Sequence, residues 1–138
     1  MNVTAKLFLT LGSISGALAV IIGAFGAHGL KDKLCEEMLA VYKTGVEYHF
    51  YHTLALLGIG LLSLHLKSTL LTASGWSMVV GILLFSGSLY ALSTSGIKIL
   101  GAITPIGGLF FIIGSVSYTH LTLPTMLAQC RSRWSPYH

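Results

Sequence analysis

The sequence is poor in charged residues, and four of its stretches contain none. Asp, Glu, Lys and Arg make up 9% of the 138 residues, against about 25% in soluble domains. The uncharged stretches are Leu7–Ala27, Tyr48–Leu66, Leu70–Ile97 and Ile99–Tyr118. Because a helix rises about 1.5 Å per residue, each stretch can cross a hydrocarbon layer about 30 Å thick. With a mean hydropathy of +0.80, the chain lacks the polar surface that a water-soluble domain needs.

Cysteine and clustered basic residues are also scarce. Cys35 and Cys130 show neither metal-ligand spacing nor a C-x-x-C motif, so we expect no disulfide framework and no metal cluster built on them. The net charge is +4, but the lysines are scattered singly, without the basic stripe interleaved with aromatics that marks a nucleic-acid binder. We therefore expect the lipid bilayer as partner, with a homo-oligomer or other membrane proteins as candidate protein partners, and no nucleic acid, no cofactor and no known small-molecule substrate.

The first stretch is longer than the 7–15-residue apolar core of a secretory signal peptide, so we interpret it as a membrane span. Its small residues are spaced four, three, four and three apart, which places them on one helix face. They are Gly12, Gly16, Ala19, Gly23 and Gly26. Small residues let helix backbones approach closely in lipid. We predict that this face packs against another span, or against a second copy of the chain in a homo-oligomer.

The segment Leu30–Gly45 carries half of the charged residues of the chain. Leu30, Leu34, Met38 and Val41 recur at spacings of four, four and three, which indicates an amphipathic helix. We predict a short helix that lies at the membrane surface between spans one and two.

The start of the second span is the most polar part of the chain. On a helix, Glu47 faces Tyr51, and Tyr48 faces His52, at a spacing of four. His28 comes from the end of span one on the same side, so His28, Glu47, Tyr48 and His52 form a candidate intramembrane cluster. Four interpretations stay open: a proton or ion site, a divalent-metal site, a haem site, or simple interfacial packing.

The last span contains Pro105, which we expect to kink it. Thr104 is a candidate to satisfy the freed backbone carbonyl. Gly101 and Gly108 form a second small face with Thr104. Because the connections after spans two and three are short, neighbouring spans are antiparallel, and we predict an all-α fold, a four-helix transmembrane bundle.

Four segments in the same order resemble the domain-of-unknown-function 423 family, small membrane proteins also called YgdD-like. They are GAFGAHGL (Gly23–Leu30), TGVEYHFYHTLALLG (Thr44–Gly58), FSGSLYAL (Phe85–Leu92) and ITPIGG (Ile103–Gly108). The resemblance implies four spans, a place in the bacterial inner membrane and no assigned enzymatic activity. It also makes His49 a weaker site candidate than its polar neighbours, since the family pattern more often has another residue there.

The end of the chain departs from that pattern. The run SYTHLTLPT after Val116 resembles translated sequencing-adapter read-through. We therefore hypothesise that 1–115 form the four-span membrane domain and that 116–138 are not native, a genuine divergent tail being the alternative.

The sequence offers no nucleophile–histidine–acid arrangement and no phosphate-binding loop, so we expect no enzyme. The first function hypothesis is a structural or assembly protein of the bacterial inner membrane, acting through the small face of span one. The second is a small proton, ion or metal transporter or channel component that uses His28, Glu47 and His52. Without the suspect tail, lysine counts favour a cytoplasmic loop between spans one and two, with both termini outside.

Overall fold

The computed structural model describes residues 2–134, and this part of the chain is all-helical. Its elements are α1 (Val3–His28), α2 (Glu36–Leu62), α3 (Thr69–Gly81), the π-helix η1 (Ile82–Ser86), α4 (Gly87–Ser95), the 3₁₀-helix η2 (Lys98–Ala102) and α5 (Thr104–Trp134). Because α3, η1 and α4 follow each other without a break, they behave as one long helix.

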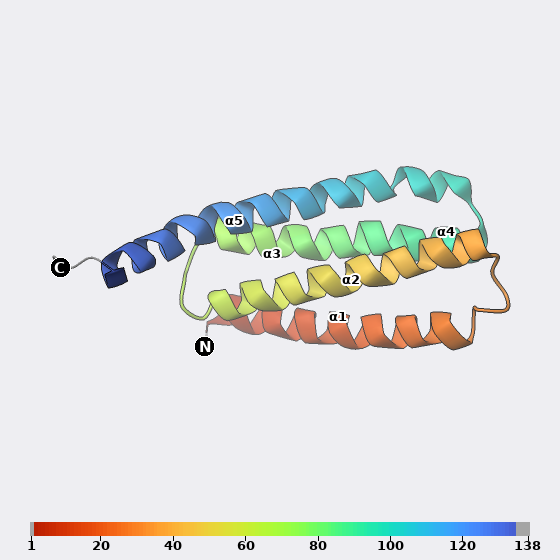
Figure 1. The fold of residues 1–138 in the computed structure, drawn as a ribbon, viewed down its shortest axis with the longest axis horizontal. Helices are drawn as coiled ribbons and strands as arrows, with labels where there is room; N and C mark the ends of the chain where they lie inside the picture. Colours follow the sequence, from red (N-terminus) through yellow and green to blue (C-terminus); the bar gives the residue numbers. More distant parts are fainter. Residues whose placement is uncertain (1, 135–138) are drawn as a thin grey trace.

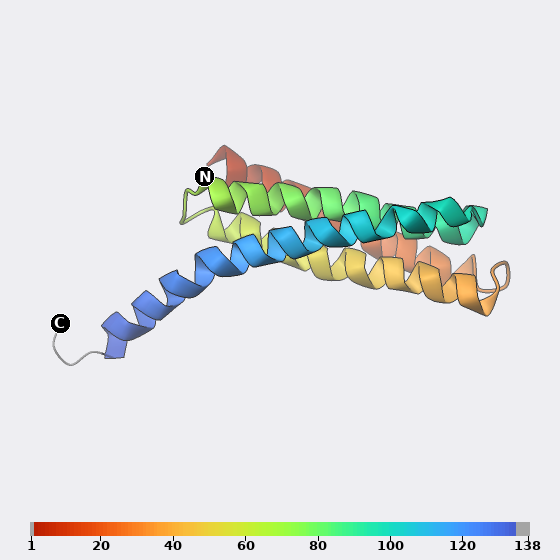
Figure 2. The ribbon, with the colours of Figure 1, turned by 90° about the horizontal axis from the view of Figure 1, so that it is seen from above.

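The long helices run antiparallel in an up-and-down bundle (Figure 1). α1 packs along α2, α3 packs along α5, and α2 also contacts α3, η1 and α4. The start of α1 and the C-terminal part of α5 lie at the same end of the bundle, where α5 extends past the other helices (Figure 2). α2 is therefore the helix with the most neighbours on different sides.

Three of these helices are long and apolar enough to cross a membrane within the described residues. They are Val3–His28, Thr69–Ser95 and Lys98–Leu121. α2 has a similar length, but its first half carries Glu36, Glu37, Lys43 and Glu47. A helical membrane bundle is thus confirmed, with three candidate spans among four long helices.

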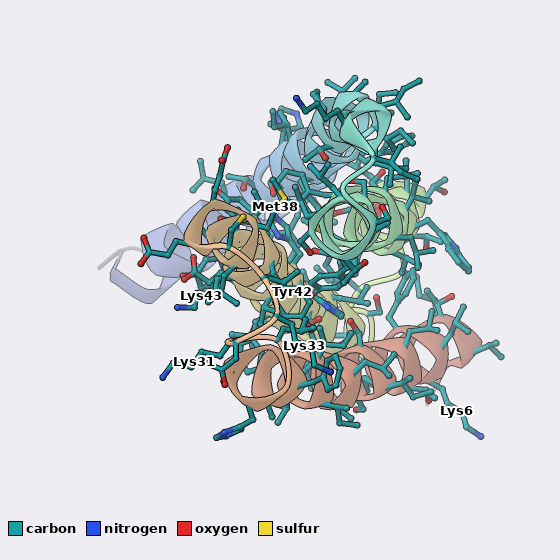
Figure 3. All side chains as sticks on the ribbon, turned by 90° about the vertical axis from the view of Figure 1, so that its right-hand side faces the viewer. Lys6, Lys31, Lys33, Met38, Tyr42 and Lys43 are labelled. Atoms are coloured by element: carbon teal, nitrogen blue, oxygen red, sulfur yellow. The ribbon has the colours of Figure 1, made fainter. Side chains whose placement is uncertain are left out.

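The prediction of a separate interfacial helix over Leu30–Gly45 is wrong. A turn occupies the residues after His28, and α2 then begins at Glu36 and continues to Leu62. The reason lies in the periodicity, because the buried stripe passes from Tyr42 through Gly45 to His49 and Thr53 in one unbroken phase. Figure 3 shows Lys31, Lys33 and Lys43 gathered around the turn that joins α1 to α2.

Pro105 begins a helix instead of kinking one, which corrects the expected kink. It is the second residue of α5, after the 3₁₀ turn of η2, and in a first turn the missing N–H has no intrahelical partner to lose. The Thr104 hydroxyl lies 2.7 Å from the Ser88 hydroxyl and joins the start of α5 to α4. The Thr104 hydroxyl therefore bonds to a side chain of a neighbouring helix, whereas we expected it to bond to a backbone carbonyl freed by Pro105.

The apolar core lies where all four long helices meet. Phe8, Leu56, Ile59, Leu71, Met78, Ile82 and Phe111 form it. Phe8 reaches from α1 to α3, where its ring meets Trp76 edge-on at 5.9 Å, and Gly75 leaves room for it. This contact holds α1 to α3 near the N-terminal ends of both helices.

The small face of α1 lies against α2. A Cβ added to Gly26 would overlap the ring of Tyr42, and one added to Gly12 would come within 2.6 Å of Leu57 Cδ2. Ala19 is fully buried, and positions 16 and 23 face Thr53 and Val46 of α2. This face is therefore occupied within the protein.

The second small face contributes less than expected. Cβ atoms at Gly101 and Gly108 would meet their neighbours at ordinary distances of 3.7 and 3.8 Å. The close approach is at Gly107, where an added Cβ would overlap the backbone of Phe85. Gly107 is the position that lets α5 cross η1 closely.

Candidate functional site

A chain of hydrogen-bonded side chains crosses the interior of the bundle, centred on His49. This imidazole is 5% exposed, and its Nε2 lies 2.9 Å from Ser15 Oγ. Its Nδ1 lies 3.0 Å from the hydroxyl of Tyr90, and Ser15 Oγ lies 2.7 Å from Thr53 Oγ1. The chain therefore runs Thr53–Ser15–His49–Tyr90 and joins α1, α2 and α4.

This polar chain lies near the middle of the bundle. Ser15 is at the centre of α1, and His49 is at the centre of α2. An ionisable side chain at such a depth is costly in lipid and by default marks a functional site. Within the described residues every buried side-chain N and O atom has a hydrogen-bond partner, so the site is internally satisfied.

The direction of the hydrogen bonds in this series of side chains depends on the His49 tautomer. A neutral imidazole donates from one nitrogen and accepts at the other. If Nδ1 carries the proton, it donates to the Tyr90 oxygen, and the Tyr90 O–H is left to donate to the neighbouring Ser86 hydroxyl or to a group in the groove. If Nε2 carries it, Tyr90 donates to Nδ1, and the phenol oxygen is left to accept.

An apolar groove of about 320 Å³ lies beside this chain. α1 forms one wall, α3, η1 and α4 form the other, and His49 and Leu56 of α2 form the floor. Its polar lining residues are Ser15, His49, Ser86 and Tyr90. The other lining residues are Gly87 and apolar side chains. A concave apolar site with a few convergent polar groups is the usual form of a small-molecule pocket.

Tyr42 contacts two of the residues that line the groove. It donates its hydroxyl to Ile22 O at 2.6 Å, and its ring lies 5.3 Å from that of Tyr90. Figure 3 shows Tyr42 turned inward between the helices.

The open side of the groove faces outward from the bundle. Ile14, Leu18 and Leu83 on its rim are 54%, 47% and 68% exposed. Since these residues lie in apolar helices of a membrane protein, the groove opens sideways into lipid.

Local sequence explains why Tyr90 reaches His49. Gly45 has no side chain, and a Cβ there would come within 2.9 Å of Tyr90 Cε1. Ser86, in the π-helical turn, donates to Gly45 O at 2.9 Å and holds α2 against η1. π-helical turns frequently occur at functional sites.

The residues of the predicted cluster are dispersed. His28 and Glu47 are exposed, and neither has a side-chain hydrogen bond or ion pair in the described part of the chain. His52 is half-buried and donates from Nδ1 to Tyr48 O at 2.7 Å, with its ring stacked 3.4 Å from that of Phe111. The structure thus brings Tyr48 and His52 together, but not His28 or Glu47.

No group of three or more His, Cys, Asp or Glu residues gathers within the described residues in a way that could hold a metal ion. Sequence reasoning ranked His49 below its neighbours and did not consider Ser15 or Thr53. The missed signal is the spacing of Gly45, His49, Thr53 and Leu56, at four, four and three, which places His49 on the buried face of α2.

Comparisons with known proteins agree with this architecture. The family described as "Protein of unknown function (DUF423)" matches residues 22–108. UPF0382 membrane protein YwdK of Bacillus subtilis is 53% identical over 109 residues, which are 78% of this chain and 89% of that protein. UPF0382 membrane proteins of Staphylococcus epidermidis and Staphylococcus aureus are 49% and 50% identical, over 79% of this chain and 88% of their own lengths.

No solved structure matches the chain. The relatives are named as membrane proteins, and the apolar helices described above are long enough to cross a bilayer. The chain belongs to the DUF423 family and is a multi-pass protein of the cell membrane.

Proposed function

We propose that α2 is a fourth membrane span. Its length is similar to that of the apolar helices, and it has neighbours on several sides. Its central polar side chains, His49 and Thr53, are hydrogen-bonded inside the bundle and need no water. A low hydropathy is therefore compatible with a transmembrane position.

Cysteine labelling from one side of the membrane tests the four-span topology. Cys35 is a free, exposed thiol in the turn before α2, and Lys67 follows α2. In a Cys130→Ala background, we expect an impermeant maleimide applied to spheroplasts to spare Cys35. In the same background with Cys35→Ser added, we expect Lys67→Cys to be labelled.

Permeabilised membranes, in which both positions react, serve as the control. Equal labelling of the two positions in intact spheroplasts would contradict a spanning α2. Labelling of Cys35 alone would keep the span and reverse the proposed orientation.

We further propose that the protein binds a lipid-soluble molecule in the groove between α1 and α4, without covalent chemistry. The observation that carries this proposal is an apolar groove open to lipid whose polar lining residues include Ser15, His49 and Tyr90. Apolar walls favour a ligand that partitions into the bilayer, and the polar floor favours one with a hydrogen-bonding group. A ligand of this kind enters by lateral diffusion.

A photoactivatable alkyl diazirine in vesicles tests the groove. We expect the labelled residues to concentrate on the groove walls, above the level found on the lipid-facing side of α5. Gly87 lines the groove, and an added Cβ there has no atom within 4 Å, so Gly87→Leu is the variant chosen to occupy the groove. We expect it to lower wall labelling to that background level.

Gly101→Leu is the matched control, because Gly101 lies outside the groove and its Cβ would meet Leu92 at an ordinary 3.7 Å. Wall labelling that is no stronger than labelling of α5, or that Gly87→Leu leaves unchanged, would contradict a binding groove.

A structural or assembly role is the second candidate. Hydrogen bonds between helices favour it, among them Ser74 Oγ to Gly114 O at 2.6 Å and Asn2 Nδ2 to Ser63 O at 2.6 Å. The small face of α1 already packs on α2, so assembly would use the lipid-facing surface of the bundle. A purely structural protein would tolerate Gly87→Leu with no change in any bound molecule.

The transport hypothesis gains no support at His28, Glu47 and His52, because their side chains do not converge. The hydrogen-bonded series of side chains through His49 is a better proton path than the predicted cluster of His28, Glu47 and His52. It ends at Thr53 and Tyr90, inside the bundle, which suits exchange with a bound ligand more than conduction between the two surfaces.

A further inference from the structure

The polar end of the groove is the hydroxyl of Tyr90, whose hydrogen-bonding sense His49 can reverse. We propose that the groove binds a lipid-soluble 1,4-quinone and its quinol, with one head-group oxygen on the Tyr90 hydroxyl. This inference rests on the proposed binding function and names the ligand class of the same groove. The steps below concern hydrogen bonds and the position of protons, and no electron transfer is involved.

The first arrangement suits a quinone. His49 Nδ1–H donates to the Tyr90 oxygen across 3.0 Å, and the Tyr90 O–H donates to the ligand carbonyl. At the other side of the ring, Nε2 accepts from the Ser15 hydroxyl across 2.9 Å. Ser15 Oγ in turn accepts from the Thr53 hydroxyl.

The second arrangement suits a quinol. The ligand O–H donates to the Tyr90 oxygen, Tyr90 donates to Nδ1, and Nε2–H donates to Ser15. Ser15 then donates to Thr53 Oγ1. In both arrangements His49, Tyr90, Ser15 and Thr53 carry the same number of protons and no net charge, and these side chains differ only in the imidazole tautomer and in hydroxyl rotation.

The lining excludes the commoner charged lipids as preferred ligands. None of the residues that line the groove is Lys, Arg, Asp or Glu. A carboxylate or phosphate placed beside His49 would be buried without a counter-charge, which is costly in a low-dielectric site. The favoured head group is therefore neutral and oxygen-bearing.

The volume and the exposed rim of the groove suit a small ring that carries an apolar tail. Its volume of about 320 Å³ lies at the small end of ligand pockets. Tyr90 lines the groove beside the head-group position, and the Tyr42 ring packs against it at 5.3 Å. The exposed rim at Leu18 and Leu83 leaves a path by which a tail can extend into lipid.

Equilibrium binding to the purified full-length protein in nanodiscs tests the proposal. The probes are a decyl-substituted 1,4-benzoquinone, its quinol under anaerobic conditions, and the dimethyl ether of that quinol, which cannot donate. We expect the quinone and the quinol to bind with similar affinity, and the ether to bind more weakly. Tyr90→Phe should weaken quinone and quinol alike by about tenfold, as for loss of one buried hydrogen bond.

The folded state of each variant is checked by size-exclusion chromatography and circular dichroism. Gly87→Leu provides a second variant that leaves the polar chain intact, and we expect it to abolish binding of all three probes. Gly101→Leu should bind all of them as the unaltered protein does.

The outcomes separate the two proposals. If the diazirine labels the groove but the quinone binds no more tightly than the ether, the quinone assignment is overturned and the binding groove stands. Decanol binding as tightly as the quinol would also overturn it, in favour of hydroxylated lipids in general. If Gly87→Leu changes neither labelling nor probe binding, both proposals fail.

Discussion

His49 contributes to the fold through the two helices that its ring joins. Its nitrogens bond to Ser15 of α1 and Tyr90 of α4, so replacing the imidazole with an apolar side chain leaves both hydroxyls without that partner. Hydrogen bonds between membrane helices average about 0.6 kcal/mol, and an unsatisfied buried group costs about 1–3 kcal/mol.

We therefore expect His49→Leu to lower the free energy of unfolding by about 1–3 kcal/mol, measured by denaturation in mixed detergent micelles. His28→Gln is the control, because His28 is exposed and takes part in no side-chain hydrogen bond in the described part of the chain. We expect that control to change stability by no more than about 0.5 kcal/mol. The opposite ranking would restore His28 as the important residue.

Replacement by alanine is expected to have opposite effects on stability at Gly26 and at Gly87. In Gly26→Ala, the new Cβ would overlap the Tyr42 ring, which Tyr42 cannot easily vacate while it donates to Ile22 O. In Gly87→Ala, the Cβ enters open space within a helix. We expect Gly26→Ala to destabilise the protein by about 1–3 kcal/mol, by overpacking.

For Gly87→Ala we expect a gain of up to about 1 kcal/mol, because alanine favours helix over glycine. The same detergent denaturation measures both variants. Equal effects at the two sites would show that the α1–α2 contact is looser than the structure has it.

At the scale of elements, the sequence predicted helices well and their boundaries less well. Charge-free runs located α1, the α3–η1–α4 helix and α5, because lipid requires about 20 apolar residues for each span. The length of α2 was missed, because its charged first turns and polar centre interrupt the hydropathy signal. α2 is continuous because one face of it is buried along its length. The residues that pack against this face lie on other helices and are distant in sequence.

The candidate site was harder to predict for the same reason. Ser15, His49 and Tyr90 are separated by more than 30 residues from one another, and each is unremarkable alone. Glu47 and Tyr48 attracted attention because they are polar neighbours in sequence, yet both are on the exposed side of α2. The phase of His49 relative to Gly45 and Thr53 was the usable signal.

Pro105 gives a prediction about an element boundary. Since it lies in the first turn of α5, its missing N–H breaks no helical hydrogen bond. We expect Pro105→Ala to change the free energy of unfolding by less than about 1 kcal/mol, against about 3 kcal/mol for a proline in a helix interior. A large stabilisation on substitution would show that the helix continues through this position and is strained there.

At the scale of the whole molecule, the C-terminal half of α5 has a part that packs on the bundle and a part that extends beyond it. Tyr118 and Leu121 pack against the apolar core cluster, whereas the helix beyond them extends past the end of the bundle (Figures 1 and 2). The hypothesis of a non-native tail from 116 onward remains a hypothesis. Because two residues of this tail contact the core, truncating the chain before and after them tests whether the tail contributes to stability.

We expect a chain that ends at residue 122 to keep the unfolding free energy of the full chain, because it retains both core contacts. A chain that ends at residue 115 loses Tyr118 and Leu121, and should be destabilised by about 2–4 kcal/mol on the basis of truncated apolar core contacts. Thermal denaturation in one detergent compares the two with the full chain. If the shorter chain were as stable as the longer one, residues 116–122 would be dispensable to the bundle, as a non-native tail requires.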